Sequence, residues 1–332
     1  MRPVKPEHPF AHYVRILAKG KRASRSLTEA EAYEAMAMIL AGEVEPEQLG
    51  AFMMLLRVKE ETADELLGFA KATRESLNLP AVLPKVDLDW PSYAGKKNHQ
   101  AWYVLAALLL AQNDIHIIIH GSAGHTENRL YTEEVFDALG LGEPQTWAEF
   151  EQQLQTWNLA YCPLRLLCPP LQHIMEMRQI MGVRSPIHTL VRLINPLDAP
   201  HLLQGIFHPS YQPTHQQAAH QLGYQNVAII KGDGGETERR PNAICKSLGV
   251  VNGQLHEESW PSILKQRQEK AKQLDPQKLV QLWRGDITDD YGVQAIQSTC
   301  ALALKLLQRA DSQEQALALA EQWWDERNKQ LI

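Results

Sequence analysis

Hydrophobic residues recur at helical spacing through residues 8–79, which predicts a small bundle of four short amphipathic helices. Ser26 or Thr28 can cap the second helix, whose first turn is acidic, and Gly42 can end it. Because so small a bundle leaves apolar surface exposed, we expect it to dock on the rest of the chain or on a second copy. The expected docking face lies on the third helix and contains Leu49, Phe52, Met53 and Leu56.

The hydrophobic pattern changes from about Lys85 onward. Strand-like runs then alternate with helical segments, and the clearest runs are 85–88, 115–119 and 226–230. This alternation predicts an α/β domain with a mainly parallel central sheet. We therefore expect a small all-helical domain over residues 1–80, joined by helices from about 169–195, and a larger α/β domain over residues 81–332.

Composition is typical of a soluble globular protein. The 332 residues are 44% hydrophobic and 22% charged, which is enough apolar content for a sizeable core. We find neither a secretory signal nor an apolar run of membrane-spanning length, so no membrane partner is expected. The four cysteines form no C-x-x-C pair. A reduced, cytoplasmic protein with no metal or other cofactor is the plain interpretation.

Charge is distributed unevenly along the chain. The net charge of −6 argues against a general nucleic-acid binder, but residues 1–25 hold seven Arg or Lys against the single acid Glu7. Residues 165–192 hold four Arg against the single acid Glu176. Such segregation can form a basic face on an acidic body, or it can reflect solvated helix faces; composition leaves both readings open.

The segment 87–98 precedes an apolar helical run and contains Gly95, Lys96 and Lys97. A phosphate-binding loop at such a position is normally rich in glycine, because glycine lets backbone N–H groups close on a diphosphate at a helix N-terminus. One glycine and two lysines indicate attraction of an anion by side-chain charge instead. The alternative is a solvated turn.

Several motifs occur in an order and spacing that characterise one family. They are Gly42-Glu43-Val44, His120-Gly121, Glu133 to Gly140, and Met177 to Arg184 followed by Asn195-Pro196. On these motifs the chain resembles the anthranilate phosphoribosyltransferase and nucleoside phosphorylase superfamily, glycosyl transferase family 3, over nearly its whole length. The resemblance implies a small helical bundle followed by a larger α/β domain.

The enzymatic motifs of that family are altered here. The Gly-Thr-Gly-Gly-Asp diphosphate loop aligns with residues 91–97, the Asn-x-Ser-Thr element with 99–102, and Lys-His-Gly-Asn with 119–122. The magnesium-binding Asp-Glu pair aligns near Glu236-Thr237, and a histidine of the anthranilate site aligns with Cys168. We therefore expect no phosphoribosyl transfer to anthranilate. Magnesium would be a cofactor only if the chain is a working transferase.

The YbiB-like branch of the superfamily is the nearer resemblance, through a Pro-Ser-Tyr segment and the turn Lys19-Gly20-Lys21-Arg22. That resemblance implies a homodimer formed through the small domain and binding to nucleic acid, by the phosphate backbone and with low sequence specificity. Two other hypotheses stay open. One is a glycosyl transferase with an unidentified substrate, and the other is an oligomeric protein-interaction scaffold.

The candidate phosphate contacts are basic residues, together with the His-Gly pair that follows a strand. They are Lys19, Lys21, Arg22, Arg25, Lys96, Lys97, His120, Gly121, Arg178, Arg184 and Arg192. Each has a structural alternative: cations after a helix end favour the helix dipole, and arginines form ion pairs. Aromatic residues near the loop, Trp90, Tyr93 and Trp102, either stack on bases or pack in the core. Asp233, Glu236 and Glu238 either hold a cation or form a charged turn.

Overall fold

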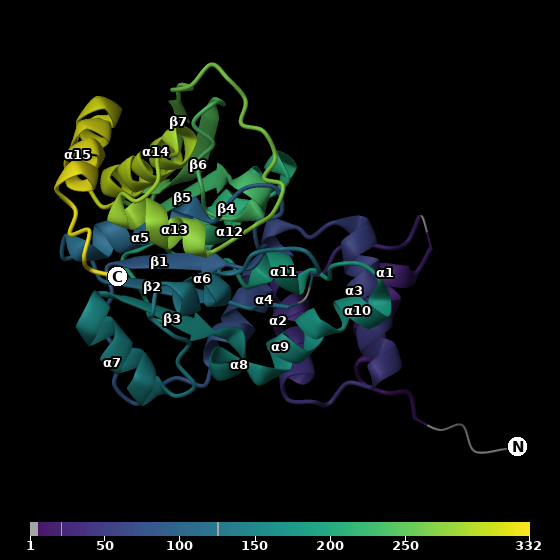
Figure 1. The fold of residues 1–332 in the computed structure, drawn as a ribbon. Coiled ribbons are helices and arrows are strands. Elements are labelled where there is room, and N and C mark those ends of the chain that lie inside the picture. The colour runs from purple at the N-terminus through teal and green to yellow at the C-terminus, as the bar shows by residue number, and fades with distance from the viewer. Residues whose placement is uncertain (1–5, 21, 125) are drawn as a thin grey trace, which may run out of the picture. The chain divides into compact units, whose positions relative to one another are not determined.

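The computed structural model describes residues 6–20, 22–124 and 126–332, and the chain divides into two compact units. Unit 1 comprises residues 1–78 and 168–194, and unit 2 comprises residues 79–167 and 195–332. The helices of unit 1 are α1 (Ala11–Ala18), α2 (Glu29–Leu40), α3 (Pro46–Lys59), α4 (Ala63–Glu75), α9 (Pro169–Glu176), α10 (Arg178–Met181) and α11 (Ile187–Leu190). In Figure 1 the purple helices α1–α4 lie beside the teal helices α9–α11.

Side-chain caps set the starts of two central helices in unit 1. Thr28 accepts a hydrogen bond from the backbone N–H of Glu31, whose carboxylate accepts one from the backbone N–H of Thr28. Thr62 and Glu65 repeat this reciprocal arrangement at α4. Each cap satisfies backbone donors that have no partner within the helix. The four predicted helices of the N-terminal segment are therefore confirmed.

The core of unit 1 is aromatic. Phe10, Phe52 and Phe69 pack edge to face, with ring centroids 5.1 and 6.3 Å apart. Of the expected docking face on α3, Phe52, Met53 and Leu56 are buried and Leu49 is half-buried. Phe52 packs against Phe10 and Phe69 of the same unit, and docking on a second copy stays a prediction. Apolar spacing identified the buried face of the helix but not the direction in which it packs.

Unit 2 contains a sheet flanked by helices. Its strands are β1 (Leu88–Ser92), β2 (Ile117–Gly121), β3 (Leu159–Pro163), β4 (His201–Ile206), β5 (Asn226–Lys231), β6 (Cys245–Val251) and β7 (Gln254–Trp260). Its α-helices are α5 (Trp102–Gln112), α6 (Thr132–Ala138), α7 (Trp147–Trp157), α8 (Leu164–Leu167), α12 (Gln212–Gln221), α13 (Gln277–Arg284), α14 (Asp290–Leu306) and α15 (Gln313–Glu326). Two 3₁₀ turns are η1 (Pro209–Tyr211) and η2 (Asp233–Gly235).

Among the described residues, the strand order of the sheet is β3-β2-β1-β4-β5-β6-β7. The pairs from β3 to β5 are parallel, and β6 and β7 are antiparallel. The predicted mainly parallel sheet is confirmed. The segment expected to be a loop is partly strand, since β1 runs to Ser92 and includes Pro91. Proline is tolerated there because β1 pairs with β4 only at Leu88 and Asp89, so a missing N–H beyond them breaks no bond to β4.

The hydrophobic core of unit 2 lies on one face of the sheet. Residues two apart in a strand share a face, and Leu88 and Trp90 of β1 and Ile117 and Ile119 of β2 all belong to this core. The core continues into α5, α13, α14 and α15, which lie close together in Figure 1. Nearly every residue of α5 is buried, as expected of a helix apolar on all sides. In the part of the chain that the structure describes, no helix is both long and apolar enough to cross a membrane.

Candidate nucleic-acid interface and the altered diphosphate loop

Two loops meet beyond the carboxyl ends of the parallel strands of unit 2. One follows β1 and contains Tyr93 to Lys96; the other follows β5 and contains Gly232 to Glu238. The backbone N–H groups of Ala94 and Gly95 donate to Oε1 of Glu236, at 2.6 and 2.5 Å. The carboxyl ends of parallel strands are where α/β proteins bind ligands. Here a carboxylate of the chain itself lies against these N–H groups.

Lys96 lies at the same place and is fully buried. Its ammonium contacts Oδ2 of Asp233 at 2.5 Å and also the carboxylate of Glu238. Nδ1 of His99 lies 3.0 Å from the same Asp233 oxygen. Lys96 is thus held between two carboxylates, a geometry that makes burial of its charge tolerable.

Burial and charge act in opposite directions on the pKa values of this cluster. Burial raises the pKa of Glu238 to about 7, although Lys96 pulls it down. Burial would also raise the pKa of Asp233, but the attraction of Lys96 and the hydrogen bond with His99 hold it below its usual range. For Lys96, burial would lower the pKa, yet Glu238 and Asp233 together raise it. Lys96 and Asp233 therefore form the charged pair of the cluster.

The expectation that Lys96 offers its charge to a phosphate is corrected by these contacts. Its partners Asp233 and Glu238 lie far away in the sequence, so local spacing gives no signal of them. The same contacts decide between the two readings of Asp233, Glu236 and Glu238, in favour of a charged turn. Their oxygens already face an ammonium or N–H groups, and a second cation beside Lys96 would be repelled. The donor set does not fit a magnesium ion.

His120 and Gly121 are core residues rather than surface contacts. His120 is fully buried on β2, with Nδ1 2.7 Å from the hydroxyl of Tyr93 and Nε2 3.2 Å from a carboxylate oxygen of Asp89. A Cβ on Gly121 would lie 2.3 Å from the carbonyl oxygen of Ser92, so glycine is required by the close approach of β1. Both expected phosphate contacts are therefore corrected to packing roles.

Lys97, in contrast, is exposed and has no ion pair among the described residues. Near it lies a basic segment that is not among the candidate phosphate contacts predicted from the sequence. We call residues 265–272 the basic strap; its cations are Lys265, Arg267, Lys270 and Lys272, all exposed, against the single acid Glu269. In Figure 1 the strap is part of the long green connection from β7 to α13. Four cations in eight residues were a signal available from sequence alone.

Hydrogen bonds fix the basic strap next to the residues that follow Lys97. The backbone N–H of Ala271 donates to the carbonyl oxygen of Asn98 at 2.7 Å. The backbone N–H of Asp275 donates to Oε1 of Gln100 at 3.2 Å. The end of the strap at Ala271 therefore lies next to the residue that follows Lys97, and we call Lys97 and the strap together the cationic surface of unit 2. Within the described parts of the chain, none of these five cations has a carboxylate partner.

The basic residues after α1 separate into two groups. Lys19 and Arg22 are exposed and without an ion pair to any described residue, whereas Lys21 lies outside the described residues. Arg25 donates from both terminal nitrogens to the carboxylate of Glu31, each at 2.6 Å. That hydrogen bond from Arg25 is the main cause that lowers the pKa of Glu31 to about 2. The expectation for Arg25 is corrected, since its guanidinium is already paired.

The arginines of residues 178–192 belong to unit 1 and are less exposed than expected. Arg178 begins α10 and is half-buried, and Arg184 is half-buried after the same helix. The carbonyl oxygen of Arg184 accepts a hydrogen bond from Arg57 at 2.8 Å. Arg192 is buried, with 6% of its surface exposed, so it does not offer a surface contact and that expectation is corrected.

The aromatic residues near the loop pack in the core. Trp90 and Tyr93 are fully buried, and Trp102 is 1% exposed. A stacking platform needs an accessible ring face, so these side chains do not stack on bases. Of the two readings of this group, the structure selects core packing.

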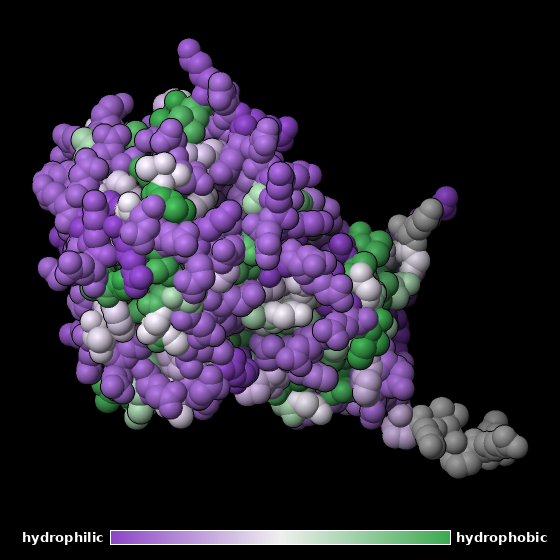
Figure 2. Space-filling model, in the orientation of Figure 1, coloured by the Kyte–Doolittle hydropathy of each residue, from purple (hydrophilic) through white to green (hydrophobic). Residues whose placement is uncertain are grey.

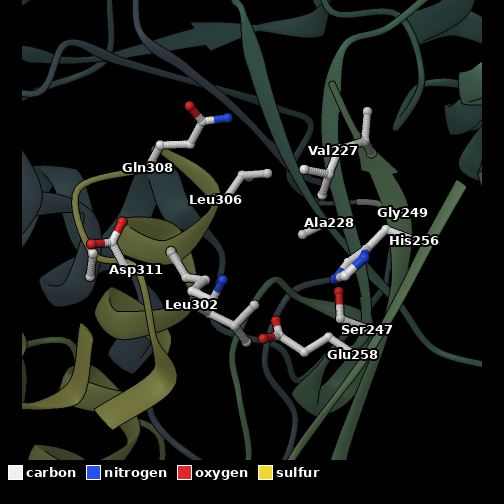
Figure 3. Close-up of a pocket in the computed structure, with 13 residues that line it drawn as sticks. Val227, Ala228, Ser247, Gly249, His256, Glu258, Leu302, Leu306, Gln308 and Asp311 are labelled. Atoms are coloured by element: carbon white, nitrogen blue, oxygen red, sulfur yellow. The ribbon is translucent and has the colours of Figure 1, made fainter. Parts of the chain in front are cut away.

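A cavity of about 270 Å³ in unit 2 has no residue of the basic strap in its lining (Figure 3). It is bounded by the sheet at Val227, Ser247 and His256 and by the end of α14 at Leu306. Two carboxylates and one lysine line it: Glu258, Asp311 and Lys305. A lining with more acid than base does not favour phosphate.

The chain matches two domains of one family. The helical bundle domain of the glycosyl transferase family matches residues 13–77, and the α/β domain of that family matches residues 103–326. The second match alone spans more than half of the chain. The protein therefore belongs to the glycosyl transferase family, and the resemblance inferred from its motifs is confirmed.

Individual relatives agree with this assignment. Uncharacterized protein YbiB of Escherichia coli strain K12 is 27% identical over 248 residues, which cover 73% of this chain and 76% of the relative. An anthranilate phosphoribosyltransferase of Brevibacillus brevis is 29% identical over 221 residues, which cover 66% of this chain and 63% of the relative. One of these relatives is uncharacterized and the other is an enzyme, so the activity of this chain has to be inferred from its own residues.

Solved structures show the same fold. Anthranilate phosphoribosyltransferase (TrpD) from Thermus thermophilus has a TM-score of 0.78 at 21% identity, covering 96% of this chain and 94% of the other. The Saccharomyces cerevisiae enzyme in complex with PRPP and Mg has a TM-score of 0.74 at 16% identity, covering 95% and 93%. The predicted anthranilate phosphoribosyltransferase-like fold is confirmed.

Proposed function

We propose that this protein is a nucleic-acid-binding homodimer built on an anthranilate phosphoribosyltransferase-like fold. The observation that carries the proposal is the cationic surface of unit 2, formed by Lys97 and the basic strap. Its five cations are exposed and have no carboxylate partner in the described chain. Lysine and arginine that are free of ion pairs neutralise phosphates and release counterions, which supplies most of non-specific nucleic-acid affinity.

The dimensions of the basic strap suit a phosphate backbone. The strap has no helix or strand, and seven residue steps from Lys265 to Lys272 extend at most about 23 Å. One strand of a duplex carries a phosphate about every 3.4 Å along the helix axis, so a strap of this length that ran along the axis would pass at most about seven phosphates. Because the nearby aromatic rings are buried, the contacts are to phosphate rather than to bases. Low sequence specificity follows.

Unit 1 supplies a second, smaller set of exposed cations, Lys19 and Arg22. A lysine or arginine just after a helix end gains little from the helix dipole, about 0.3–1 kcal/mol. That gain does not require two unpaired cations in four residues. We include both residues in the proposed phosphate contacts, and we keep Arg178 and Arg184 as contacts of lower exposure.

The proposal is tested by replacing Lys265, Arg267, Lys270 and Lys272 together with alanine. The control replaces Arg15, Lys71, Arg165 and Lys246, which also removes four positive charges, but from exposed ion pairs. Binding of a labelled 20-nucleotide duplex at low salt is measured by fluorescence anisotropy. We expect the strap variant to lose roughly ten- to hundredfold in affinity and the control to lose far less. Equal losses would show that net charge alone matters.

The homodimer is supported by an exposed apolar face on unit 1. Val58 is 83% exposed at the end of α3, and Ile180 is 87% exposed on α10. The hydrogen bond from Arg57 of α3 to the carbonyl oxygen of Arg184 ties α3 to the segment that follows α10 and contains the exposed Val183. Figure 2 shows hydrophobic residues gathered over this region of α3 and α10. Large exposed apolar side chains that cluster mark an interaction surface.

The dimer is tested by sedimentation at micromolar concentration. We expect the parent to sediment as a dimer and Ile180→Asp to sediment as a monomer, because a charge in an apolar interface is costly. Ile244→Asp is the control, since Ile244 is 72% exposed on unit 2. A monomeric parent would remove the homodimer from the proposal.

The alternative function is a glycosyl transferase with an unidentified substrate, and family membership supports it. Against it, the N–H groups of the loop after β1 already hold Glu236, and the Lys96 cluster disfavours a metal. We therefore expect no product when the purified protein is incubated with phosphoribosyl diphosphate, anthranilate and magnesium. Metal-dependent product formation would make the alternative the better account.

A further inference from the structure

The loop after β1 binds the carboxylate of Glu236 in the way that a protein binds a free anion. The Glu236 side chain is fully buried, and its Oε1 accepts the successive backbone N–H groups of Ala94 and Gly95. Its Oε2 accepts a hydrogen bond from the Ser92 hydroxyl at 2.9 Å. Successive backbone N–H groups that converge on one oxygen form a concavity that binds anions. Here the anion is part of the chain.

The loop that contains Ala94 and Gly95 is fixed by contacts that do not involve Glu236. Arg129 Nη1 donates to the carbonyl oxygens of Ala94 and Gly95, at 2.9 and 2.7 Å, on the side of the loop opposite to the N–H groups. The backbone of Lys96 pairs in both directions with that of Leu130, at 2.8 and 2.9 Å. These bonds fix the loop and aim its N–H groups at the position of the carboxylate.

Ser92 is held in the same way. Its hydroxyl lies 2.8 Å from that of Thr132 and 3.1 Å from that of Tyr103, and those two lie 2.8 Å from each other. All three side chains are almost completely buried. Because the Ser92 hydroxyl donates its proton to Glu236, it can accept hydrogen bonds from Tyr103 and Thr132, and these contacts keep it oriented towards the anion position. The N–H pair and this hydroxyl therefore form a pre-organised set of donors.

The segment that carries Glu236 is, in contrast, rich in glycine. Gly234 and Gly235 have φ values of +69° and +94°, so the turn before Glu236 uses conformations that other residues rarely adopt. The carboxylate of Glu236 therefore follows a turn that contains two glycines. The N–H donors, in contrast, lie in a loop that is fixed by hydrogen bonds to Arg129 and Leu130.

We propose that Ala94, Gly95 and Ser92 form a binding site for a small oxyanion, and that the carboxylate of Glu236 is its internal ligand. The covalently attached carboxylate is present at a high effective concentration and carries the charge that an external anion would bring. In the parent protein, the carboxylate of Glu236 therefore excludes free anions from this site. Removal of the Glu236 side chain opens the site. This inference is independent of nucleic-acid binding, because it concerns buried donors and not the basic strap.

The test is rescue of Glu236→Ala by acetate. Acetate replaces the methylene and carboxylate that the substitution removes, and sodium chloride of equal ionic strength is the reference. We expect Glu236→Ala to melt at a lower temperature than the parent, and acetate to raise that temperature by about 2 °C or more. Inorganic phosphate is a second probe. The parent should respond to neither beyond the chloride reference.

Two further variants keep the test decisive. Glu133→Ala removes another carboxyl group of unit 2, one that accepts a hydrogen bond from the Tyr161 hydroxyl, and acetate should not rescue it. Glu236→Gln keeps an oxygen that accepts both N–H groups, so it should stay folded and closed. If Glu236→Ala does not fold in chloride, refolding yield in acetate is measured instead. Absence of rescue by acetate and phosphate in both melting and refolding would overturn the proposal.

Discussion

Lys96 and Lys97 are neighbours in sequence and opposites in structure. Lys96 is fully buried between Asp233 and Glu238, whereas Lys97 is exposed beside the basic strap. A charge in the interior stabilises the fold through its partners, and a charge on the surface without a partner is available to a ligand. A pair of lysines in a loop therefore does not indicate phosphate binding until the partners of each lysine are known.

The largest expected difference between the two lysines is in stability. Lys96→Ala leaves Asp233 and Glu238 buried without their cation, and we expect it to lower the free energy of unfolding by about 3–5 kcal/mol. Lys97→Ala should change that free energy by no more than about 0.5 kcal/mol. Urea unfolding of both variants measures the difference. Similar values for the two would contradict the buried cluster.

The next expected effect concerns a buried carboxyl group and pH. Burial raises the pKa of Glu133 to about 7, against 4.5 for the unperturbed group. A raised pKa means that the folded state prefers the protonated form, so this contribution is complete below pH 4.5 and is lost as pH rises through 7. Glu133→Gln cannot titrate. Between pH 5 and 8 we expect the parent to lose on the order of 2 kcal/mol more stability than this variant. Identical pH profiles from chemical unfolding would refute the assignment.

The smallest expected effects concern Arg22 and Arg25, two surface arginines whose replacement should have different consequences. Arg25→Ala breaks an exposed ion pair with Glu31, which is worth about 0–1 kcal/mol, and should leave nucleic-acid binding unchanged. Arg22→Ala should leave stability unchanged and make the salt dependence of binding shallower by about 0.7–0.9 units. Thermal unfolding measures the stability of the two variants, and fluorescence anisotropy measures their affinity for nucleic acid at several salt concentrations. The reverse pattern would exchange the roles of Arg22 and Arg25.

Much of the fold was predictable because it depends on local periodicity. Helical spacing and a cap at Ser26 or Thr28, of which the structure selects Thr28, identified α1 and α2. The alternation of strands with helices identified the parallel sheet. The extent of β1 was not predictable in this way. Pro91 disfavours a central strand, and it is tolerated only because β4 stops pairing with β1 before that position.

The candidate site was less predictable, for two physical reasons. Whether Lys96 is free depends on Asp233 and Glu238, which the fold brings together from more than a hundred residues away. Arg25 is paired with Glu31 only six residues on, but Arg25 lies between α1 and α2 and not on a helix, so helical spacing does not predict that contact. The basic strap, by contrast, is a purely local signal and could have been found by counting charges from residue 265 to 272.

The most direct test of the account is the salt dependence of nucleic-acid affinity, from about 50 to 200 mM salt, for the parent and the strap variant. Each lost phosphate contact makes the log–log slope shallower by about 0.9 for a duplex or about 0.7 for a single strand. Loss of all four strap cations should therefore make the slope shallower by up to about 3.6 for a duplex and about 2.8 for a single strand, and by similar amounts for unrelated sequences. Equal slopes for the two proteins, or a parent that does not bind, would contradict the proposed function.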